Sequence, residues 1–272
     1  MTQVQWFPGH MAKAIRLIEE TIRTVDFVIE CRDARAPFST RNPVLARATH
    51  QKKVLVLLTK KDLATKASVS FWETKLQAEG AEVLAIDVLN DAIKPLILEK
   101  TKIIMHDKHE RDKRRGIRSR TPRAMIVGVP NVGKSTVINQ LASKRSAKVE
   151  NRPGVTQSLK LIKVGKDLEI IDTPGVLWPK FENEEMGIKC ALIGSIKETG
   201  YPLDLVSNYG LKNISEASIK SHYDLPKTDT FFEDLAESKG FLFKGGSLDT
   251  ETSRRTFLQD LQNGLLGAVS WD

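Results

Sequence analysis

Short apolar runs rich in β-branched residues recur along the first two thirds of the chain. Between them lie segments with helical periodicity, such as 72–80, which a glycine ends, and 136–142, which opens directly after a glycine-rich turn. Strands that alternate with helices are typical of an α/β layered fold with a mostly parallel sheet, and we predict that architecture here. The predicted strands are 27–31, 54–58, 83–86, 125–129, 159–164 and 168–171.

The strand pattern stops near residue 183. Beyond it, helical segments follow one another, separated by Gly200-Tyr201-Pro202, by Pro226 and by Gly245-Gly246. Glycine and proline at such positions end helices, so the sequence predicts a small all-helical domain after the α/β domain. We therefore expect two domains, 1–182 and 183–272.

Composition supports a globular protein. The chain has 272 residues, of which 40% are hydrophobic, which is enough to bury a sizeable core. No apolar stretch approaches the roughly 18 residues that span a bilayer, and the first 25 residues contain Glu19 and Glu20 and lack a leader-like pattern. We expect a cytoplasmic protein that uses no membrane, and with only Cys31 and Cys190, reduced thiols rather than disulfides.

The formal charge of +8 suggests a polyanionic partner. Most of the surplus lies between Glu99 and Arg123, where ten basic residues face four acidic ones. A solvated helix or linker with interleaved charges would give the same pattern, but contact with phosphates is the interpretation that we prefer. The basic residues are Lys100, Lys102, Lys108, Arg111, Lys113, Arg114, Arg115, Arg118, Arg120 and Arg123.

Residues 128–135, Gly-Val-Pro-Asn-Val-Gly-Lys-Ser, fit the phosphate-binding pattern G-x-x-x-x-G-K-[ST]. The segment follows a predicted strand and opens a predicted helix, as phosphate binding by backbone amides and a helix N-terminus requires. Lys134 would reach the β- and γ-phosphate oxygens, and the Ser135 hydroxyl would ligate Mg²⁺. A mere tight turn is a poor explanation for so specific a pattern.

Two further segments fit the switches of a nucleotide hydrolase. Asp172-Thr173-Pro174-Gly175 follows the last predicted strand, which places a carboxylate near the Mg²⁺ shell and the Gly175 amide near a γ-phosphate. Thr156 lies in the long connection upstream, where a first switch supplies a second hydroxyl to Mg²⁺, although an isolated Thr in a loop commonly has no such role.

A base-reading motif stands upstream of the phosphate loop. Thr59-Lys60-Lys61-Asp62 ends the strand 54–58 and resembles the [NT]-K-x-D motif of GTPases. The Asp62 carboxylate can accept hydrogen bonds from the N1–H and 2-amino groups of guanine, whereas adenine presents a lone pair at N1, so the motif selects GTP. Lys60 would lay its aliphatic stem along the ring. Thr59 stands where Asn is usual, and 86–89 lies where a further base loop is expected.

The motifs therefore run as base reader, base loop, phosphate loop, first switch, second switch, which is a circular permutation of the order in ordinary small GTPases. With Trp6-Phe7-Pro8-Gly9-His10-Met11, Asp33-Ala34-Arg35 and 172–179, the chain closely resembles the YlqF/RbgA family. The resemblance implies a circularly permuted P-loop GTPase domain and action in late maturation of the large ribosomal subunit, with that subunit and its rRNA as partners. We expect a monomer in which the second switch runs directly into the helical domain.

Two catalytic features follow from the permuted family pattern. Val176 stands where Ras-like enzymes carry a water-orienting Gln, and the resemblance points to His10 as the group that replaces it. His10 could instead pack with Trp6 and Phe7. Asn131 stands where potassium-activated GTPases carry a ligand for K⁺, although it could simply cap the loop.

We expect GTP or GDP, with Mg²⁺ and K⁺, to occupy the site. The expected nucleotide-binding residues are Thr59, Lys60, Asp62, Pro130, Asn131, Val132, Gly133, Lys134, Ser135, Thr136, Thr156, Asp172 and Gly175. Two other functions stay open at this point: a P-loop ATPase or nucleoside kinase in which 59–62 is accidental, and a non-catalytic RNA-binding module that keeps GTP as a structural ligand.

Overall fold

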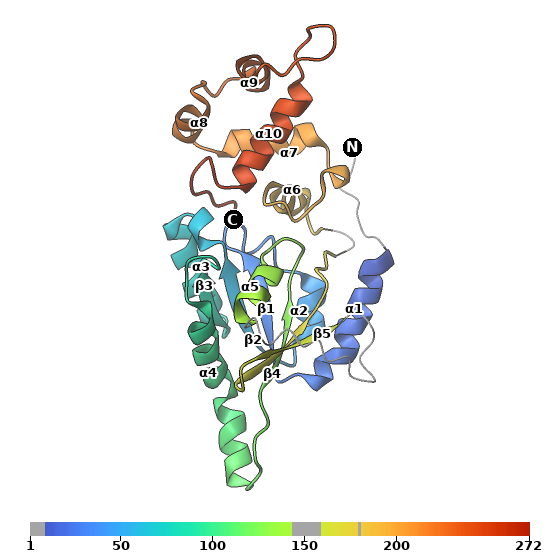
Figure 1. Ribbon diagram of the computed structural model, residues 1–272, viewed down its shortest axis with the longest axis vertical. Helices are drawn as coiled ribbons and strands as arrows, with labels where there is room; N and C mark the ends of the chain where they lie inside the picture. The colour runs from blue at the N-terminus through green and yellow to red at the C-terminus, as the bar shows by residue number, and fades with distance from the viewer. Residues whose placement is uncertain (1–8, 143–158, 179–180) are drawn as a thin grey trace. The chain divides into compact units, whose positions relative to one another are not determined.

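The computed structural model of the protein describes residues 9–142, 159–178 and 181–272, with side chains from Met11 onward. Two compact units make up the chain, one containing Phe7–Pro179 and the other Lys180–Trp271 (Figure 1). Within the described residues, no helix is both long enough and apolar enough to cross a membrane. Both cysteines are buried free thiols, as the sequence predicts.

The first unit is built on a six-stranded sheet of order β3-β2-β1-β4-β6-β5. Every neighbouring pair is parallel except the edge strand β5, which runs antiparallel to β6. All six strands lie within two residues of their predicted bounds, and the mostly parallel α/β architecture is confirmed. The strands are β1 (Phe27–Asp33), β2 (Lys53–Thr59), β3 (Glu82–Ile86), β4 (Arg123–Val127), β5 (Lys160–Val164) and β6 (Leu168–Asp172).

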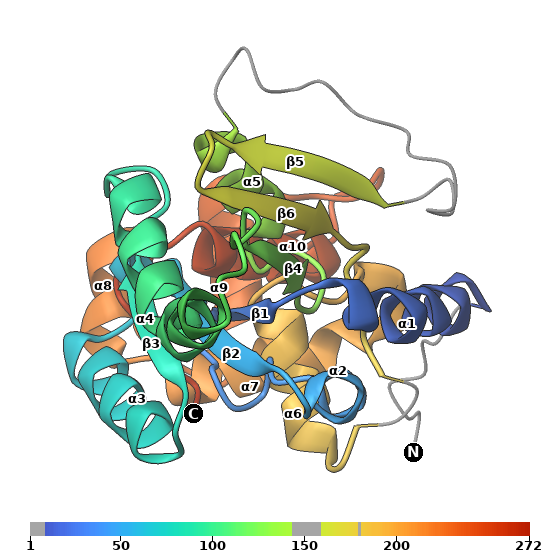
Figure 2. The same cartoon turned by 90° about the horizontal axis from the view of Figure 1, so that it is seen from below.

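Helices cover both faces of this sheet. Figure 2 shows α4 and α5 on one face and α1 and α2 on the other. The helices of this unit are α1 (Gly9–Thr21), α2 (Pro43–Thr49), α3 (Lys66–Ala78), α4 (Ile93–Arg114) and α5 (Lys134–Leu141), with short 3₁₀ turns η1 (Ile22–Thr24) and η2 (Lys61–Leu63). The helix expected over 72–80 begins six residues earlier, at Lys66, and the added turns bring Val69 against the core cluster that holds Trp72 and Leu76.

The centre of the sheet is β1, in which every residue is buried. A strand flanked by parallel neighbours on both edges and covered on both faces is expected to read as an unbroken apolar run. In β1 the charged side chains of Glu30, Arg32 and Asp33 interrupt that run. Glu30 pairs with Arg32 over 2.7 Å, and Asp33 pairs with Arg35 over 2.9 Å.

In its described residues, 181–271, the second unit is built of helices and has one isolated β-bridge, between Leu242 and Leu248. Aromatic rings of Phe231, Phe232 and Phe257 pack edge-to-face between α9 and α10 and form its centre. Side-chain caps from Asn183, Ser215 and Asp249 begin three of the helices. The helices are α6 (Glu184–Leu192), α7 (Leu203–Asn213), α8 (Glu216–Tyr223), α9 (Phe231–Lys239) and α10 (Thr250–Gln262), with the turn η3 (Glu198–Gly200).

Candidate functional site

The phosphate-binding pattern forms a tight loop between β4 and α5. Gly128 has φ +150°, and a Cβ there would lie 2.5 Å from the carbonyl oxygen of Cys31, so only glycine fits. Asn131 and Gly133 are left-handed, with φ 59° and 90°. These turns curl the backbone into the amide-lined concavity that binds anions, and the N-terminus of α5 adds its positive potential.

Lys134 lies at the bottom of this loop and is 7% exposed. Its ammonium donates to the carbonyl oxygens of Gly128 and Val129 over 3.0 and 2.7 Å. Burial lowers the pKa of the Lys134 side chain, while the neighbouring Cys31 and Asp172 side chains oppose that shift. The ammonium is therefore held among dipoles inside the loop, where a phosphate would gain much from its charge.

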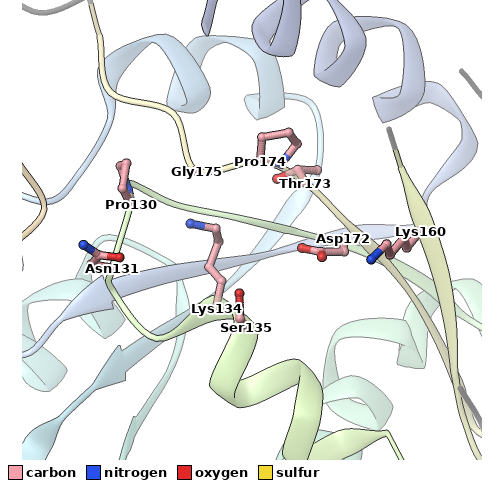
Figure 3. A pocket seen from close by; sticks show the side chains of 9 residues that line it. All are labelled: Pro130, Asn131, Lys134, Ser135, Lys160, Asp172, Thr173, Pro174 and Gly175. Atoms are coloured by element: carbon pink, nitrogen blue, oxygen red, sulfur yellow. The ribbon is translucent and has the colours of Figure 1, made fainter. Parts of the chain in front are cut away.

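A cavity of about 430 Å³ opens between this loop and the segment after β6. Figure 3 shows Lys134, Ser135 and Asp172 directed into one space, with Lys160 beside Asp172. The lining residues are Pro130, Asn131, Lys134, Ser135, Lys160, Asp172, Thr173, Pro174 and Gly175. Six of them are among the expected nucleotide-binding residues, and Lys160, Thr173 and Pro174 are additions.

The second-switch segment touches the phosphate loop directly. A Cβ on Gly175 would lie 2.9 Å from Pro130 Cα and 3.0 Å from Lys134 Nζ, so a side chain here would press on the phosphate loop. Burial raises the pKa of Asp172, and the positive charges of Lys134 and Lys160 oppose the rise. A carboxylate in this setting favours a nearby cation.

The side chain of Val176 does not line the cavity. Its side chain is fully buried, its amide donates to the Gly128 carbonyl over 3.2 Å, and its own carbonyl accepts from Asn42 Nδ2 over 2.7 Å. Asn42 also caps α2 through the amides of Val44 and Leu45. The second switch is thereby held between the phosphate loop and the start of α2.

The guanine motif joins the same edge of the sheet. Thr59 Oγ1 lies 2.6 Å from the carbonyl oxygen of Val132 and 3.0 Å from that of Arg32, so the Thr59 hydroxyl ties β2 to the phosphate loop. Lys60 Nζ donates to the Asn131 carbonyl over 2.9 Å. Asp62 is exposed on η2, where its carboxylate is accessible to a base.

The base loop at 86–90 is held by hydrogen bonds among its own residues. Asp87 accepts from the amides of Leu89 and Asn90 over 3.0 and 3.3 Å, and from Asn90 Nδ2 over 2.6 Å. Asp91 accepts the Asp87 amide and pairs with Lys61 over 2.6 Å. This loop is therefore tied to the motif that contains Lys60 and Asp62.

Two of the predicted residues have side chains outside the described part of the structure. Thr156 lies outside the described residues, and His10 lies in α1 with its side chain outside the described part. Thr136 is half-buried in the first turn of α5, beside the exposed Ser135.

Lys160, Thr173 and Pro174 line the cavity without having been singled out. Lys160 opens β5 and is paired in register with Asp172 on β6, which explains its place at the cavity. The sequence alone does not single out Lys160, because it is one of two lysines in an otherwise apolar strand. Its place at the cavity follows only from the antiparallel pairing of β5 with β6. Thr173 donates its hydroxyl to the Ile126 carbonyl over 2.7 Å and fixes the start of the second switch.

Fewer side chains of the basic segment are available to bind phosphates than its sequence suggests. Four of its ten positive side chains are paired inside the unit: Lys108 and Arg120 with Asp26, Lys100 with Glu82, and Arg123 with Glu169. In the part of the chain that the structure describes, the other six are exposed and have no carboxylate partner. They lie on α4, whose C-terminal end projects beyond the sheet in Figure 1, and on the turn after it. These residues are Lys102, Arg111, Lys113, Arg114, Arg115 and Arg118.

Comparison with known proteins now identifies the chain's relatives. Residues 123–225 match the family described as 50S ribosome-binding GTPase. Ribosome biogenesis GTPase A of Bacillus licheniformis is 38% identical, over 99% of this chain and 98% of that protein. The Thermotoga maritima protein of the same name is 31% identical, over 99% and 94%. Mitochondrial ribosome-associated GTPase 1 of Mus musculus is also 31% identical, over 98% and 90%.

Solved structures agree with the sequence relatives. The GNP-bound YlqF of T. maritima superposes with a TM-score of 0.72 at 28% identity, covering 96% of this chain and 97% of that one. Its GDP-bound structure gives 0.69 at 27% identity, covering 94% and 97%. These relatives confirm the resemblance to YlqF/RbgA, the prediction of a GTP hydrolase and guanine nucleotides as its ligands, and they exclude the ATPase or kinase alternative. The chain belongs to the ribosome biogenesis GTPase A (YlqF/RbgA) family.

Proposed function

We propose that this GTPase is a switch that binds the maturing large ribosomal subunit and hydrolyses GTP in the cavity between 128–135 and 172–175. The proposal is supported by one observation above all: the phosphate loop, the Asp172 carboxylate and the guanine motif converge at one edge of the sheet. That edge joins the carboxyl ends of parallel strands, where ligands bind in open α/β sheets.

The phosphates would bind to the amides of 131–136 and to Lys134. The Lys134 ammonium would exchange the carbonyl oxygens of Gly128 and Val129 for β- and γ-phosphate oxygens, which carry full negative charge. Guanine would bind to the Asp62 carboxylate with the stem of Lys60 along its ring, because Asp62 is exposed next to the loop tied by Thr59 and Lys60.

The donors in the cavity suit Mg²⁺, which prefers oxygen ligands and is commonly held by one or two protein groups together with phosphates. Ser135 supplies a hydroxyl and Asp172 a carboxylate, and Thr156 is the expected third donor. When bound, Mg²⁺ would neutralise the charge that develops on the phosphates. Asn131, which lines the same cavity, is the candidate ligand for K⁺.

Water activation would fall to His10, since the aliphatic side chain of Val176 is buried away from the cavity. A neutral imidazole accepts a hydrogen bond from water and has a pKa suited to general base catalysis near neutral pH.

Ribosomal RNA would bind to the exposed basic side chains on and after α4 and to the helical domain, proposed to span 183–272. The names of the relatives support a ribosomal partner, and the description of the matching family supports the large subunit. A monomer in the cytoplasm, with GTP hydrolysis stimulated by the subunit, completes the proposal.

Sedimentation with purified large subunits tests it. We expect the chain to pellet with subunits in a non-hydrolysable GTP analogue far more than in GDP, and Lys134→Ala to lose that difference. Equal pelleting of the unaltered protein in both nucleotides would contradict the switch.

A further inference from the structure

A buried acid–base cluster lies directly behind the guanine motif. Asp33 is the last residue of β1 and pairs in register with Thr59, the last residue of β2. The Asp33 side chain is fully buried, and Arg35 is 1% exposed. The cluster stands at the cavity edge of the sheet without lining the cavity itself.

Both oxygens of the Asp33 carboxylate are engaged. Oδ1 accepts from the backbone amide and Nε of Arg35, over 3.0 and 2.9 Å, and Oδ2 accepts from Nη2 over 2.9 Å. A second cation reaches the same carboxylate, because Lys60 Nζ lies 3.0 Å from Oδ2. This lysine also donates to the Asn131 carbonyl of the phosphate loop.

Lys60 needs such an anchor. Its backbone is left-handed, at φ 56° and ψ 39°, a conformation that costs energy for a residue with a side chain. The left-handed turn directs the chain into η2, while the side chain returns to Asp33 and Asn131. Asp33 and the phosphate loop therefore hold Lys60 from two sides, and Asp62 follows two residues later.

Stability alone is a weak reason for this cluster. The attraction within a fully buried ion pair barely offsets the hydration that both groups lose. Well-packed apolar side chains often replace such pairs without loss of stability. Glu30 and Arg32 of β1 form another buried pair, at 2.7 Å, yet no contact joins either side chain to Lys60 in the described residues.

We propose that Asp33, oriented by Arg35, is a positioning residue for guanine recognition that fixes Lys60 between the base motif and the phosphate loop. The proposal rests on the proposed roles of Lys60 and Asp62 in binding the base. Asp33 itself touches no nucleotide in this account. It acts by holding the Lys60 stem where the ring would lie and by keeping the turn that presents Asp62.

The charge state of the cluster agrees with this role. Burial alone would raise the pKa of Asp33, but Arg35 and Lys60 outweigh it and hold the pKa below its usual range. The carboxylate is therefore ionised at neutral pH and attracts the Lys60 ammonium.

The first test compares Asp33→Asn with Glu30→Gln, its matched control. Each variant neutralises a carboxylate of β1 that belongs to a buried ion pair. We expect Asp33→Asn to weaken binding of fluorescent GDP roughly 10- to 100-fold, the scale of one lost charge-assisted hydrogen bond, and Glu30→Gln to stay within about threefold. Equal losses in both variants would overturn the proposal, since they would reflect general destabilisation.

Asp33→Asn leaves Arg35 buried without its partner and could fail to fold. The double variant Asp33→Asn/Arg35→Gln replaces the pair by neutral groups and avoids that penalty. It should weaken GDP binding as much as Asp33→Asn does, with a melting temperature close to that of the unaltered protein. Unchanged GDP affinity in this folded variant would likewise overturn the proposal.

A double-mutant cycle shows whether Asp33 acts through Lys60. In a Lys60→Met background the same neutral pair should weaken GDP binding by less than about threefold, because the side chain that it positions is gone. Full additivity would contradict the proposal. Asp62→Asn is measured in parallel with GDP and XDP. If it keeps its preference for GDP, the assigned base site is wrong, whereas a switch towards XDP with no effect at Asp33 refutes only the positioning role.

Discussion

At the scale of single residues, the proposed nucleotide site concentrates buried charge. Lys134 is 7% exposed and its pKa is lowered by burial, and the neighbouring Asp172 has its pKa raised by burial. Both groups are costly to keep ionised where they lie. The two pKa shifts have the directions expected of a site that is stabilised when it binds phosphates and a cation.

Removing the phosphate-loop lysine separates binding from folding. Lys134→Ala should weaken binding of GDP and GTP by roughly 100-fold or more, since a phosphate would lose two charge-assisted contacts. Its melting temperature should fall little, because burial makes the ammonium costly to keep charged and its hydrogen bonds go to carbonyl oxygens. Fluorescent-nucleotide titration and thermal unfolding check the two halves. Wild-type nucleotide affinity would remove Lys134 from the site.

The proposed catalytic histidine makes a different prediction. His10→Ala should lower GTP turnover stimulated by large subunits roughly 100-fold, the usual scale for a lost general base, while nucleotide affinity stays within a few-fold. Single-turnover hydrolysis with and without subunits measures it. If the variant instead loses nucleotide binding and thermal stability together, His10 is a packing residue.

At the scale of elements, α4 divides into two parts with different tasks. Its first half buries Ile93, Ile97 and Thr101 in the core of the α/β unit, and its last turn carries exposed arginines. The pairing of Lys108 with Asp26, over 2.5 Å, lies where the two parts meet. The projecting end is therefore a basic surface on a firmly held helix.

Charge reversal tests that surface. Arg114→Glu, Arg115→Glu and Arg118→Glu together should weaken large-subunit binding and flatten its salt dependence, because each lost phosphate contact removes roughly one unit from the log–log slope. Lys13→Glu, Lys66→Glu and Lys166→Glu change the net charge equally at exposed positions elsewhere in the same unit. The same slope in both triple variants would mean that only net charge matters.

At the scale of the whole molecule, Asp26 joins three elements of the α/β unit. Its carboxylate accepts from Lys108 of α4, from Arg120, and from the backbone amide of Arg123, which opens β4. Burial alone would raise the pKa of Asp26, but these partners outweigh it and lower the pKa. The stabilisation that Asp26 gives is therefore present above the unfolded pKa of about 3.9 and is lost as the pH falls below it.

Acid should thus expose the role of Asp26 in stability. Asp26→Asn should lower the free energy of unfolding of the α/β unit by about 2 kcal/mol at pH 7, the scale of a hydrogen bond to a charged group, and by less as the pH falls through 4. Urea unfolding at several pH values measures this. Asp107→Asn, which removes an exposed pair with Lys53, is the control and should change little. A loss at Asp26 that does not depend on pH would contradict the assignment.

The sequence by itself determined the strands, the order of the motifs and the family, because these depend on local patterns. An apolar run such as Val54–Leu58 is a strand in nearly any context, and the glycines of 128–135 have backbone requirements that few other loops share. The absence of the usual water-orienting Gln is likewise evident from a single sequence position, Val176.

Only the tertiary structure decided which charges meet. Lys108, Arg120 and Arg123 counted as free cations until Asp26 and Glu169, far away in the chain, came to lie beside them. Lys160 entered the cavity through its pairing with Asp172, and Asp33 met Lys60 because two parallel strands end in register. The physical reason is common to these cases: burial and pairing depend on what neighbouring strands and helices bring into contact, and no local pattern encodes that partner.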